Sequence, residues 1–561
     1  MATLADLRAL ERLRTEFGAE AARARLALLR RLARARLAGA EAVRRLHEVL
    51  CFARAYPDDA AVLRQVERLS TGFARRADLR RHAEELADSG IAGTALHYPY
   101  FAETAAWLAR RFPRQLGVDW ELVDDDTEQK LLDRLDPLVL YCETPGLDEI
   151  DLPMRAWVAR LKHAAEGDGA FLARSFAAVG AEPFLRESYY DELGLPLVLA
   201  PGPGTPARTH ARAGFLGRAP VFQRGPLRSQ RPAMEEALRR VPRVRALSAA
   251  DGARAIELAR EAMVTRSRDL DVFAYGDPRD VRLLECEDGL AFLAIGFRPE
   301  RRLPFEAVYG FLTLKNSVPI GYVLNSALCG SAEIAYNVFE TYRGGEAGHV
   351  YGWVLACVRH LFGVDAFTIY PYQLGHENEE GLASGAWWFY QRLGFRPRDR
   401  GALALMRHEL ARQRRDPRQR SSRATLMRLA RHNVYYFHGR ERADVIGLLP
   451  LGRLSLRASA YLARRFGSDR ARGERECARE AGRRLGVRSF RGWKRSELEA
   501  WTRLAPVVGL LDGLERWSAA EKRAAVQVLR AKGGRRESDF VRLFDAHAKL
   551  RRALVRAAGR G

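Results

Sequence analysis

The sequence predicts an α+β protein in which a central mixed β-sheet with helices is flanked by N-terminal and C-terminal regions that are mostly α-helical. Three observations carry this prediction. Apolar residues recur at helical spacing before residue 192 and after residue 400. Short strand-like runs separated by Gly and Pro turns occupy much of 240–400. The chain has 561 residues, 47% of them hydrophobic, which is enough for about two to four packed domains.

Residues 1–192 are predicted to form an α-helical domain. Leu26, Leu29 and Leu37 recur among Arg and Ala residues, which favour helix. The triplet Pro57-Asp58-Asp59 is typical of a boundary between helices. The region shows no pattern of catalytic residue types, so it is interpreted as a scaffold or interaction domain.

A Pro-rich connector is predicted at 193–239, because seven of the 24 prolines lie in 196–232. The connector contains Gly202-Pro203-Gly204-Thr205-Pro206-Ala207, which nominally fits the dinucleotide pattern GxGxxA. Prolines interrupt the pattern and no helix is predicted directly after it, so we do not expect a dinucleotide site there.

The predicted domain at 240–400 has a mixed fold. A helix at 249–264 precedes an antiparallel meander of strands at Leu290–Phe297, Ala307–Leu314, Ile320–Ser326 and Glu333–Phe339. A Gly-rich turn, a helix at 349–362, a strand at Phe367–Tyr370 and a helix at 384–393 follow. This order predicts a meander that continues into a β-α-β-α segment.

Residues 401–561 are predicted to form a basic α-helical domain. Amphipathic helices are expected at 403–414, 423–432, 453–465, 495–515, 519–531 and 539–557, the last with Ser538 as its N-cap. The formal net charge is +23, and 401–561 carries all of this excess with 39 basic and 16 acidic residues. Such a module attracts polyanions. The alternative is a solvated basic face, because Arg and Ala are abundant along the whole chain.

A Gly-rich turn, Tyr342-Arg343-Gly344-Gly345-Glu346-Ala347-Gly348, lies between a predicted strand and a predicted helix. Consecutive small residues let backbone N–H groups converge on one point, and the helix N-terminus adds the positive end of its dipole. Arg343 adds a full charge. The turn is therefore interpreted as a phosphate or pyrophosphate site, with an ordinary strand-to-helix turn as the alternative.

The order of elements in 332–395, which ends in Trp388-Phe389-Tyr390-Gln391-Arg392-Leu393-Gly394-Phe395, resembles the GNAT acyltransferase superfamily. In that family a strand leads to a pyrophosphate loop of the form (Gln/Arg)-x-x-Gly-x-(Gly/Ala) and then to a long helix. A further strand and a helix ending in a Phe-Tyr-x-x-x-Gly-Phe-like signature follow. The resemblance covers about 240–400, and it implies acetyl-coenzyme A or another acyl-coenzyme A as co-substrate.

The resemblance also implies the residues that hold the donor. In the family the strand before the loop splays from its neighbour, and its backbone pairs with the pantetheine arm. The donor would then contact Asn337, Val338, Phe339, Arg343, Gly344, Gly345, Ala347, Gly348 and Asn378. The fourth motif position holds Glu346 where the family has Gly, and a carboxylate there is unfavourable beside a pyrophosphate unless it points outward.

The family's chemistry is direct attack of an amine on the thioester, so the amine must lose a proton and the thiolate must gain one. Tyr390 matches the position of the general-acid tyrosine. Glu340 and Glu333 are the candidate bases, directly or through water. For each residue a structural role is the alternative. The acidic loop 375–381 favours a cationic acceptor, either a small molecule or a protein that bears an amine.

The competing hypothesis is a non-catalytic GNAT-like scaffold whose module at 401–561 binds nucleic acid or another polyanion. Some relatives of the superfamily use aminoacyl-tRNA as donor, which would combine the two hypotheses. The six cysteines form no CxxC pair and the twelve histidines show no ligand spacing, so no metal is expected. The sequence lacks GxSxG, GxxxxGK[ST] and HExxH. Without an apolar leader or a membrane-length apolar run, a cytoplasmic protein is predicted.

Overall fold

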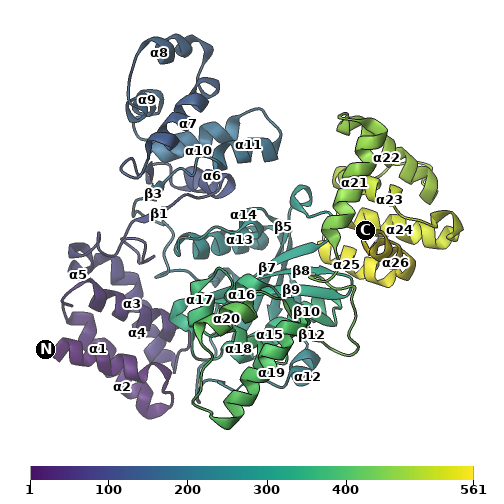
Figure 1. Ribbon diagram of the computed structural model, residues 1–561. Helices are drawn as coiled ribbons and strands as arrows, with labels where there is room; N and C mark the ends of the chain where they lie inside the picture. Colours follow the sequence, from purple (N-terminus) through teal and green to yellow (C-terminus); the bar gives the residue numbers. More distant parts are fainter. Residues whose placement is uncertain (1, 231, 560–561) are drawn as a thin grey trace. The chain divides into compact units, whose positions relative to one another are not determined.

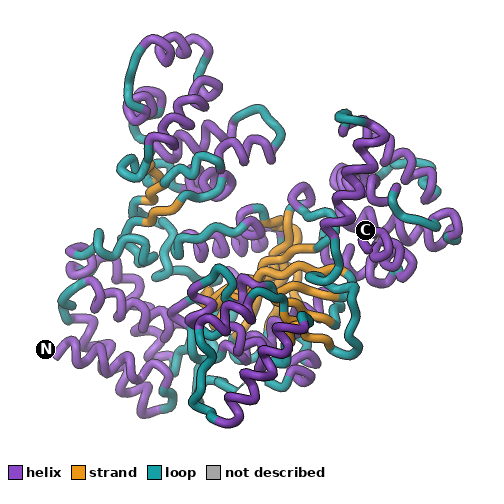
Figure 2. Tube along the Cα trace, in the orientation of Figure 1, coloured by secondary structure: helices purple, strands orange, loops and turns teal. Residues whose placement is uncertain are grey.

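The computed structural model describes residues 2–230 and 232–559, and it divides into two compact units. The first unit consists of Met1–Leu227, Ala253–Tyr275 and Leu314–Ile320. The second unit consists of Arg228–Gly252, Gly276–Thr313 and Gly321–Gly561. Helices make up most of the first unit, whereas the second is built on a large sheet (Figures 1 and 2). Within the described residues, no helix is both long and apolar enough to cross a membrane.

The first unit begins with a helical layer that has its own apolar core. Its helices are α1 (Ala2–Arg12), α2 (Ala19–Arg34), α3 (Ala40–Ala55), α4 (Ala60–Gly72) and α5 (Ala77–Arg81). Leu29, Val43 and Leu46 are fully buried in this core. Asp59 caps α4 by accepting hydrogen bonds from the N–H groups of Ala61 and Val62, which explains why the helix begins after the Pro-Asp-Asp triplet.

A second core in the first unit surrounds a small antiparallel sheet in the order β1-β3-β2. The strands are β1 (Leu96–Tyr98), β2 (Leu116–Val118) and β3 (Leu197–Leu199), and the helices are α6 (Ala102–Arg111), α7 (Asp125–Leu135), α8 (Thr144–Glu149), α9 (Met154–Leu161), α10 (Asp168–Ala178) and α11 (Pro183–Asp191). The region predicted as purely helical therefore contains two strands. The third strand comes from the region predicted as an irregular connector.

The same unit includes α13 (Ala249–Val264) from Ala253 onward, together with α14 (Asp271–Ala274). The bounds of α13 agree with the prediction. Asp269 fixes the end of this segment on α6, because its carboxylate accepts hydrogen bonds from the N–H of Phe101 at 3.0 Å and the hydroxyl of Thr104 at 2.9 Å.

The second unit is organised on a mixed sheet in the order β11-β12-β10-β9-β8-β7-β6-β5-β4. The strands are β4 (Arg243–Ala246), β5 (Gly276–Glu285), β6 (Leu290–Phe297), β7 (Ala307–Lys315), β8 (Val318–Leu328), β9 (Ser331–Val338), β10 (Ala366–Ile369), β11 (Arg396–Pro397) and β12 (Val434–Phe437). The predicted strands in 290–370 are confirmed within two residues. The β9–β10 pair is parallel, whereas the described pairings of β4, β5, β11 and β12 are antiparallel.

Helix α15 (Ala347–Phe362) connects the two parallel strands (Figure 1). Most of its residues are buried. It ends at Gly363, whose φ of 75° is the left-handed cap that favours glycine. Helix α12 (Met234–Arg239) packs against it. Val354 and Leu355 of α15 share one core with Phe367 of β10 and with Trp387 of α18 (Ala386–Arg392).

The remaining helices are α16 (Pro371–Leu374), α17 (Glu379–Ala383), α19 (Arg400–Arg415), α20 (Arg423–Ala430), α21 (Leu451–Phe466), α22 (Arg470–Leu485), α23 (Arg495–Gly509), α24 (Ala519–Lys532), α25 (Glu537–Ala546) and α26 (Ala548–Gly559). The predicted helix at 539–557 is two helices that meet at His547. The prediction of Ser538 as N-cap is wrong, because α25 begins at Glu537 and the Ser538 N–H donates instead to the Tyr309 hydroxyl at 3.1 Å.

The C-terminal helices belong to the same compact unit and the same apolar core as the sheet. Polar groups reinforce this packing. Arg302, beside the sheet, donates to the carbonyl oxygens of Lys532 and Gly534, both at 2.7 Å. Arg442 and Arg551 each form an ion pair with Asp444. Because β12 lies between β10 and β11, the sheet continues beyond residue 400.

Candidate functional site

The two parallel strands of the sheet separate after a short stretch of pairing. β9 and β10 pair at Ser331–Ala366, Ala332–Phe367 and Glu333–Thr368. β10 then ends at Ile369, whereas β9 continues to Val338 and is paired there only with β8 among the described strands. Residues 335–338 are only partly buried. Among the described strands, β9 therefore has no partner on its β10 side in this stretch, and such an edge can pair with a ligand that forms strand-like hydrogen bonds.

The Gly-rich turn follows directly after this open edge. A short 3-10 helix, Glu340–Tyr342, leads into the turn, and α15 begins at Ala347 (Figure 1). Gly344 has a φ of 88°, and a Cβ added to it would meet no atom within 4 Å. The turn is thus open on its Gly344 side, and the N-terminal amides of α15 lie at the end of β9.

Glu346 is the residue at which the turn departs from the family's motif. It does not point outward into solvent, because its side chain is 3% exposed and accepts a hydrogen bond from the Arg228 N–H at 3.2 Å. It is the N-cap residue of α15 but forms no side-chain capping hydrogen bond to that helix. The Glu346 side chain therefore does not cap α15, although its residue directly precedes the first turn of that helix.

Arg343 and Asn378 have defined partners in the structure. The Arg343 Nε donates to the Val338 carbonyl oxygen at 3.2 Å, and its guanidinium forms an ion pair with Glu380 of the acidic loop. Asn378 accepts a hydrogen bond from the Gly381 N–H at 3.1 Å and so caps α17. Arg343 thus lies at the open edge, whereas the Asn378 side chain is engaged in helix capping.

Tyr390 lies in a cluster of three tyrosines beneath the start of α15. Its ring packs edge-on against Tyr351 at 5.5 Å, and Tyr351 packs against Tyr336 of β9 at 5.2 Å. Tyr390 is 3% exposed, and burial raises the pKa of its hydroxyl. The Tyr336 hydroxyl is 3.4 Å from the Ala347 carbonyl oxygen. A protonated phenol is therefore held at the junction of β9 and α15.

Glu333 lies on the opposite face of β9 from Tyr336, because the two residues are three positions apart in a strand. Burial, and then the nearby Glu306 carboxylate, raise the pKa of Glu333 to about 7, against a weak hydrogen bond from Ser326 at 3.4 Å. The Glu333 charge in turn contributes to the raised pKa of Tyr370, the residue after β10. Glu333 is thus a carboxyl group that can exchange a proton near neutral pH, at the point where the strands separate.

The structure brings together most of the residues that the sequence singled out. Asn337 and Val338 form the end of β9, Phe339 precedes the short 3-10 helix, and the turn residues follow. Glu340 is exposed on the 3-10 helix, apart from the strand interior. Glu306 and Tyr370 were missed by sequence reasoning, because only the pairing of strands distant in the chain places them near Glu333.

A cluster of metal-ligand type lies near the start of α15. Potential ligand atoms of Glu287, Asp288 and His349 lie within 4.8 Å of one another. Arg228 already forms ion pairs with Glu287 at 2.7 Å and with Asp288 at 2.8 Å, and Trp353 Nε1 donates to Glu287 at 3.2 Å. The guanidinium supplies the positive charge that these carboxylates require, so the cluster is explained as an ion-pair network.

The chain matches no protein-family model, no curated protein and no solved structure.

Proposed function

We propose that the protein is an N-acyltransferase that moves an acetyl or other acyl group from acyl-coenzyme A to an amine acceptor. The observation that carries the proposal is the separation of β9 from β10 after Glu333–Thr368, with the Gly-rich turn at the open end of β9. This arrangement agrees with what the GNAT resemblance implies. It would place a pantetheine arm along residues 335–338 and a pyrophosphate at the N-terminus of α15.

Two groups, the partly buried Glu333 and the buried Tyr390, support the chemistry of acyl transfer. Attack of the amine nitrogen on the thioester carbonyl carbon forms the amide bond and breaks the carbon–sulfur bond, so one proton leaves the amine and the thiolate accepts one. Glu333, with a pKa near neutrality, suits the role of base. Tyr390 stays protonated and suits the role of acid. Glu333 lies on one face of β9, and Tyr390 packs through Tyr351 against Tyr336 on the other face.

The first experiment measures donor binding by the full chain. Acetyl-coenzyme A and a longer acyl-coenzyme A are titrated by calorimetry, and the melting temperature is followed in parallel. Binding with a rise in melting temperature supports the proposal. The absence of both a heat of binding and a shift in melting temperature at millimolar ligand would overturn the proposal.

Variants of the turn test where the donor binds. Glu346→Gln should tighten binding because it removes a negative charge near the pyrophosphate position, and Arg343→Ala should weaken it, each by about two- to fivefold. Arg453→Ala removes an exposed arginine from α21 and serves as the matched control with unchanged affinity. If Glu346→Gln weakens binding, the pyrophosphate does not lie at this helix.

Polyanion binding is the second candidate function, and the surface of α22 favours it. This helix exposes Arg470, Arg472, Arg475, Arg479 and Arg483. Arg479 forms an ion pair with Glu476 at 2.8 Å, whereas no acidic side chain among residues 2–230 and 232–559 pairs with Arg472, Arg475 or Arg483.

Filter binding of single-stranded RNA to the full chain tests this candidate. The affinity should fall steeply between 50 and 200 mM salt, and replacing Arg472, Arg475 and Arg483 by Ala should reduce the salt slope by about 2–3. An affinity that ignores salt, or that the triple variant leaves unchanged, would contradict this function.

A further inference from the structure

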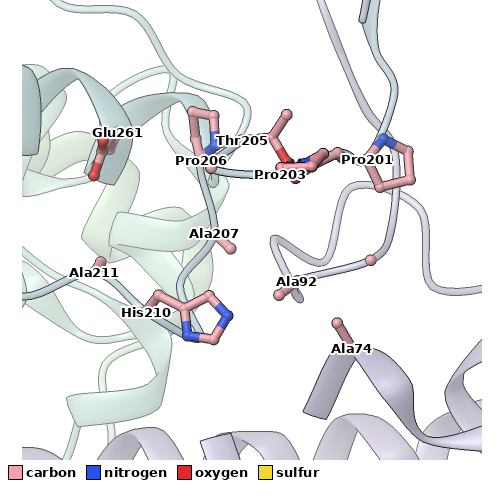
Figure 3. A pocket seen from close by; sticks show the side chains of 13 residues that line it. Ala74, Ala92, Pro201, Pro203, Thr205, Pro206, Ala207, His210, Ala211 and Glu261 are labelled. Carbon is pink, nitrogen blue, oxygen red and sulfur yellow. Dashed lines mark hydrogen bonds between the residues drawn. The ribbon is translucent and has the colours of Figure 1, made fainter. Parts of the chain in front are cut away.

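The first unit contains a cavity of about 520 Å³ that plays no part in the proposed acyl transfer. Its volume lies within the range of small-molecule sites, about 300–1,000 Å³. The segment 201–207, which includes the glycine-and-proline pattern noted in the sequence, forms one wall. Glu261 of α13 and Ala211 lie on one side in Figure 3, and Ala74 and Ala92 lie on the other. No helix follows the pattern directly, so a dinucleotide would find no helix N-terminus there.

The walls of the cavity are fixed by hydrogen bonds within the first unit. The Thr209 hydroxyl accepts from the Ala92 N–H at 2.9 Å and bonds the His47 ring at 2.8 Å. The Arg208 N–H donates to the Gly90 carbonyl oxygen at 2.8 Å. The Thr205 hydroxyl closes the turn by donating to the Gly202 carbonyl oxygen at 2.9 Å. The cavity is therefore formed before a ligand enters, which lowers the entropic cost of binding.

The lining has a simple chemistry. Seven of the 13 lining residues are prolines or alanines, and among the described residues the only titratable side chains that line the cavity are Glu261 and His210. His210 is exposed to solvent, whereas Glu261 is partly buried. In the described part of the chain, no group donates a hydrogen bond to the Glu261 carboxylate. No Lys or Arg within residues 2–230 and 232–559 lines the cavity.

A carboxylate without a donor, set among apolar side chains, favours a ligand that brings a positive charge and hydrogen-bond donors. A neutral ligand would leave the carboxylate uncompensated, and an anion would be repelled. We propose that this cavity binds a small aliphatic amine in its ammonium form, with the ammonium group on Glu261 and the hydrocarbon chain against the proline and alanine wall. The proposal concerns binding alone and stands independently of acyl transfer.

The ionisation of Glu261 gives the proposal a pH signature. Burial, and then the Glu257 carboxylate, raise the pKa of Glu261 to about 7, while Arg111 opposes the shift. His210, which lines the same cavity, is the other titratable side chain that faces Glu261 among the described residues. An aliphatic ammonium stays charged well above pH 8. Affinity should therefore rise as the pH increases from 6 to 8, because an increasing share of Glu261 is ionised before the ligand arrives.

The test is a calorimetric titration of the full chain with cadaverine and spermidine, with glutarate as the anionic counterpart. The amines should bind and glutarate should not. Glu261→Gln should reduce amine affinity at least tenfold and abolish its dependence on pH. Glu84→Gln, an exposed glutamate of the same unit that does not line the cavity, is the matched control and should bind as the original chain does.

A second variant controls for an effect of the Glu261→Gln substitution on folding. Ala74→Leu fills the cavity from the opposite wall and should also reduce amine affinity, with an unchanged circular dichroism spectrum. Three results would overturn the proposal: glutarate binding as well as the amines, amine binding that survives both variants, or no binding of either amine at millimolar concentration.

Discussion

Glu333 of β9 and Thr368 of β10 form the last register pair between the two parallel strands. The two side chains lie on the same face of the sheet but have different partners. The Thr368 hydroxyl donates to the Ile446 carbonyl oxygen at 2.8 Å and is satisfied, whereas Glu333 faces Ser326 at 3.4 Å and the field of Glu306. The separation point thus combines a fixed strand end with a carboxyl group whose ionisation is costly.

Replacing Glu333 by Gln should separate stability from activity. The folded-state pKa of about 7 lies above the ordinary value of 4.5, so the stability contributed by this group is fully present below about pH 4.5 and is lost as the pH rises through 7. The free energy of unfolding of Glu333→Gln should therefore increase by on the order of 1–3 kcal/mol, relative to that of the original chain, as the pH rises from 5 to 8. Urea unfolding at both pH values measures the change.

In the same variant, acyl transfer should fall by about a hundredfold or more if Glu333 is the base. Glu340→Gln changes the exposed candidate base and is the matched control. It should leave the free energy of unfolding and the rate of acyl transfer nearly unchanged. Full turnover by Glu333→Gln would exclude Glu333 as the base.

Tyr390→Phe removes one hydroxyl and keeps the ring that packs against Tyr351. If the hydroxyl protonates the leaving thiolate, kcat should fall while the dissociation constant of acetyl-coenzyme A stays the same. Steady-state kinetics together with calorimetry distinguish the two quantities. An unchanged kcat would leave Tyr390 a structural residue.

Gly321→Ala should destabilise the sheet beside the open edge. A Cβ at Gly321 would lie 2.3 Å from the Asn337 carbonyl oxygen, so β8 and β9 must move apart, at a cost of about 1–3 kcal/mol. Urea unfolding measures the loss. Gly452→Ala, at an exposed position of α21 where no atom lies within 4 Å, should be neutral or stabilising. Equal effects from both substitutions would contradict the close approach of β8 to β9.

Lys532→Met should lower the free energy of unfolding by about 3–5 kcal/mol, because it removes the cation that pairs with the buried carboxylate of Glu537. The two side chains form an ion pair at 2.5 Å and are 4% and 0% exposed. Lys549→Met breaks the more exposed pair with Glu521 and should lower the free energy of unfolding far less, because solvent screens that pair. Denaturant unfolding monitored by Trp fluorescence compares them, and similar losses would show that Lys532 is not buried in solution.

A thiol reagent should distinguish Cys142 from the other cysteines. Cys142 is exposed, whereas Cys51, Cys329, Cys357 and Cys477 are buried and burial raises the pKa of each thiol. The native chain should show one rapidly reacting thiol, and Cys142→Ser should remove it. Cys286 is partly exposed and should react more slowly than Cys142, and rapid reaction of more than these two thiols would mean that one of the buried positions opens to solvent.

Periodicity predicted the elements that are long and regular. β6 has the predicted bounds, and α15 begins two residues before its prediction. β5 was missed because Gly276-Asp277-Pro278 does not resemble a strand, and its pairing with β6 shifts register between Gly276 and Val281. The strands β1, β2 and β3 have three residues each, too few for an alternating pattern. β12 exists because β10 and β11 pair with both of its edges, a partnership that local sequence does not reveal.

The candidate site was predicted as a strand, a turn and a helix, and these elements are present in that order. What sequence could not supply was the environment of each group. Glu346 accepts its hydrogen bond from Arg228, which lies more than a hundred residues earlier in the chain. The same holds for the cavity beside Glu261, whose walls come from four separate segments. Long-range contacts, rather than local preference, decide these features.

The position of β12 between β10 and β11 has a consequence for how the chain is made. During translation β10 leaves the ribosome well before β12 is synthesised. One hydrogen-bonding edge of β10 therefore stays unpaired until β12 has been made. A polypeptide truncated at residue 400 would keep that edge exposed permanently and would be prone to aggregate. Expression trials should therefore retain the C-terminal helices even when the sheet alone is of interest.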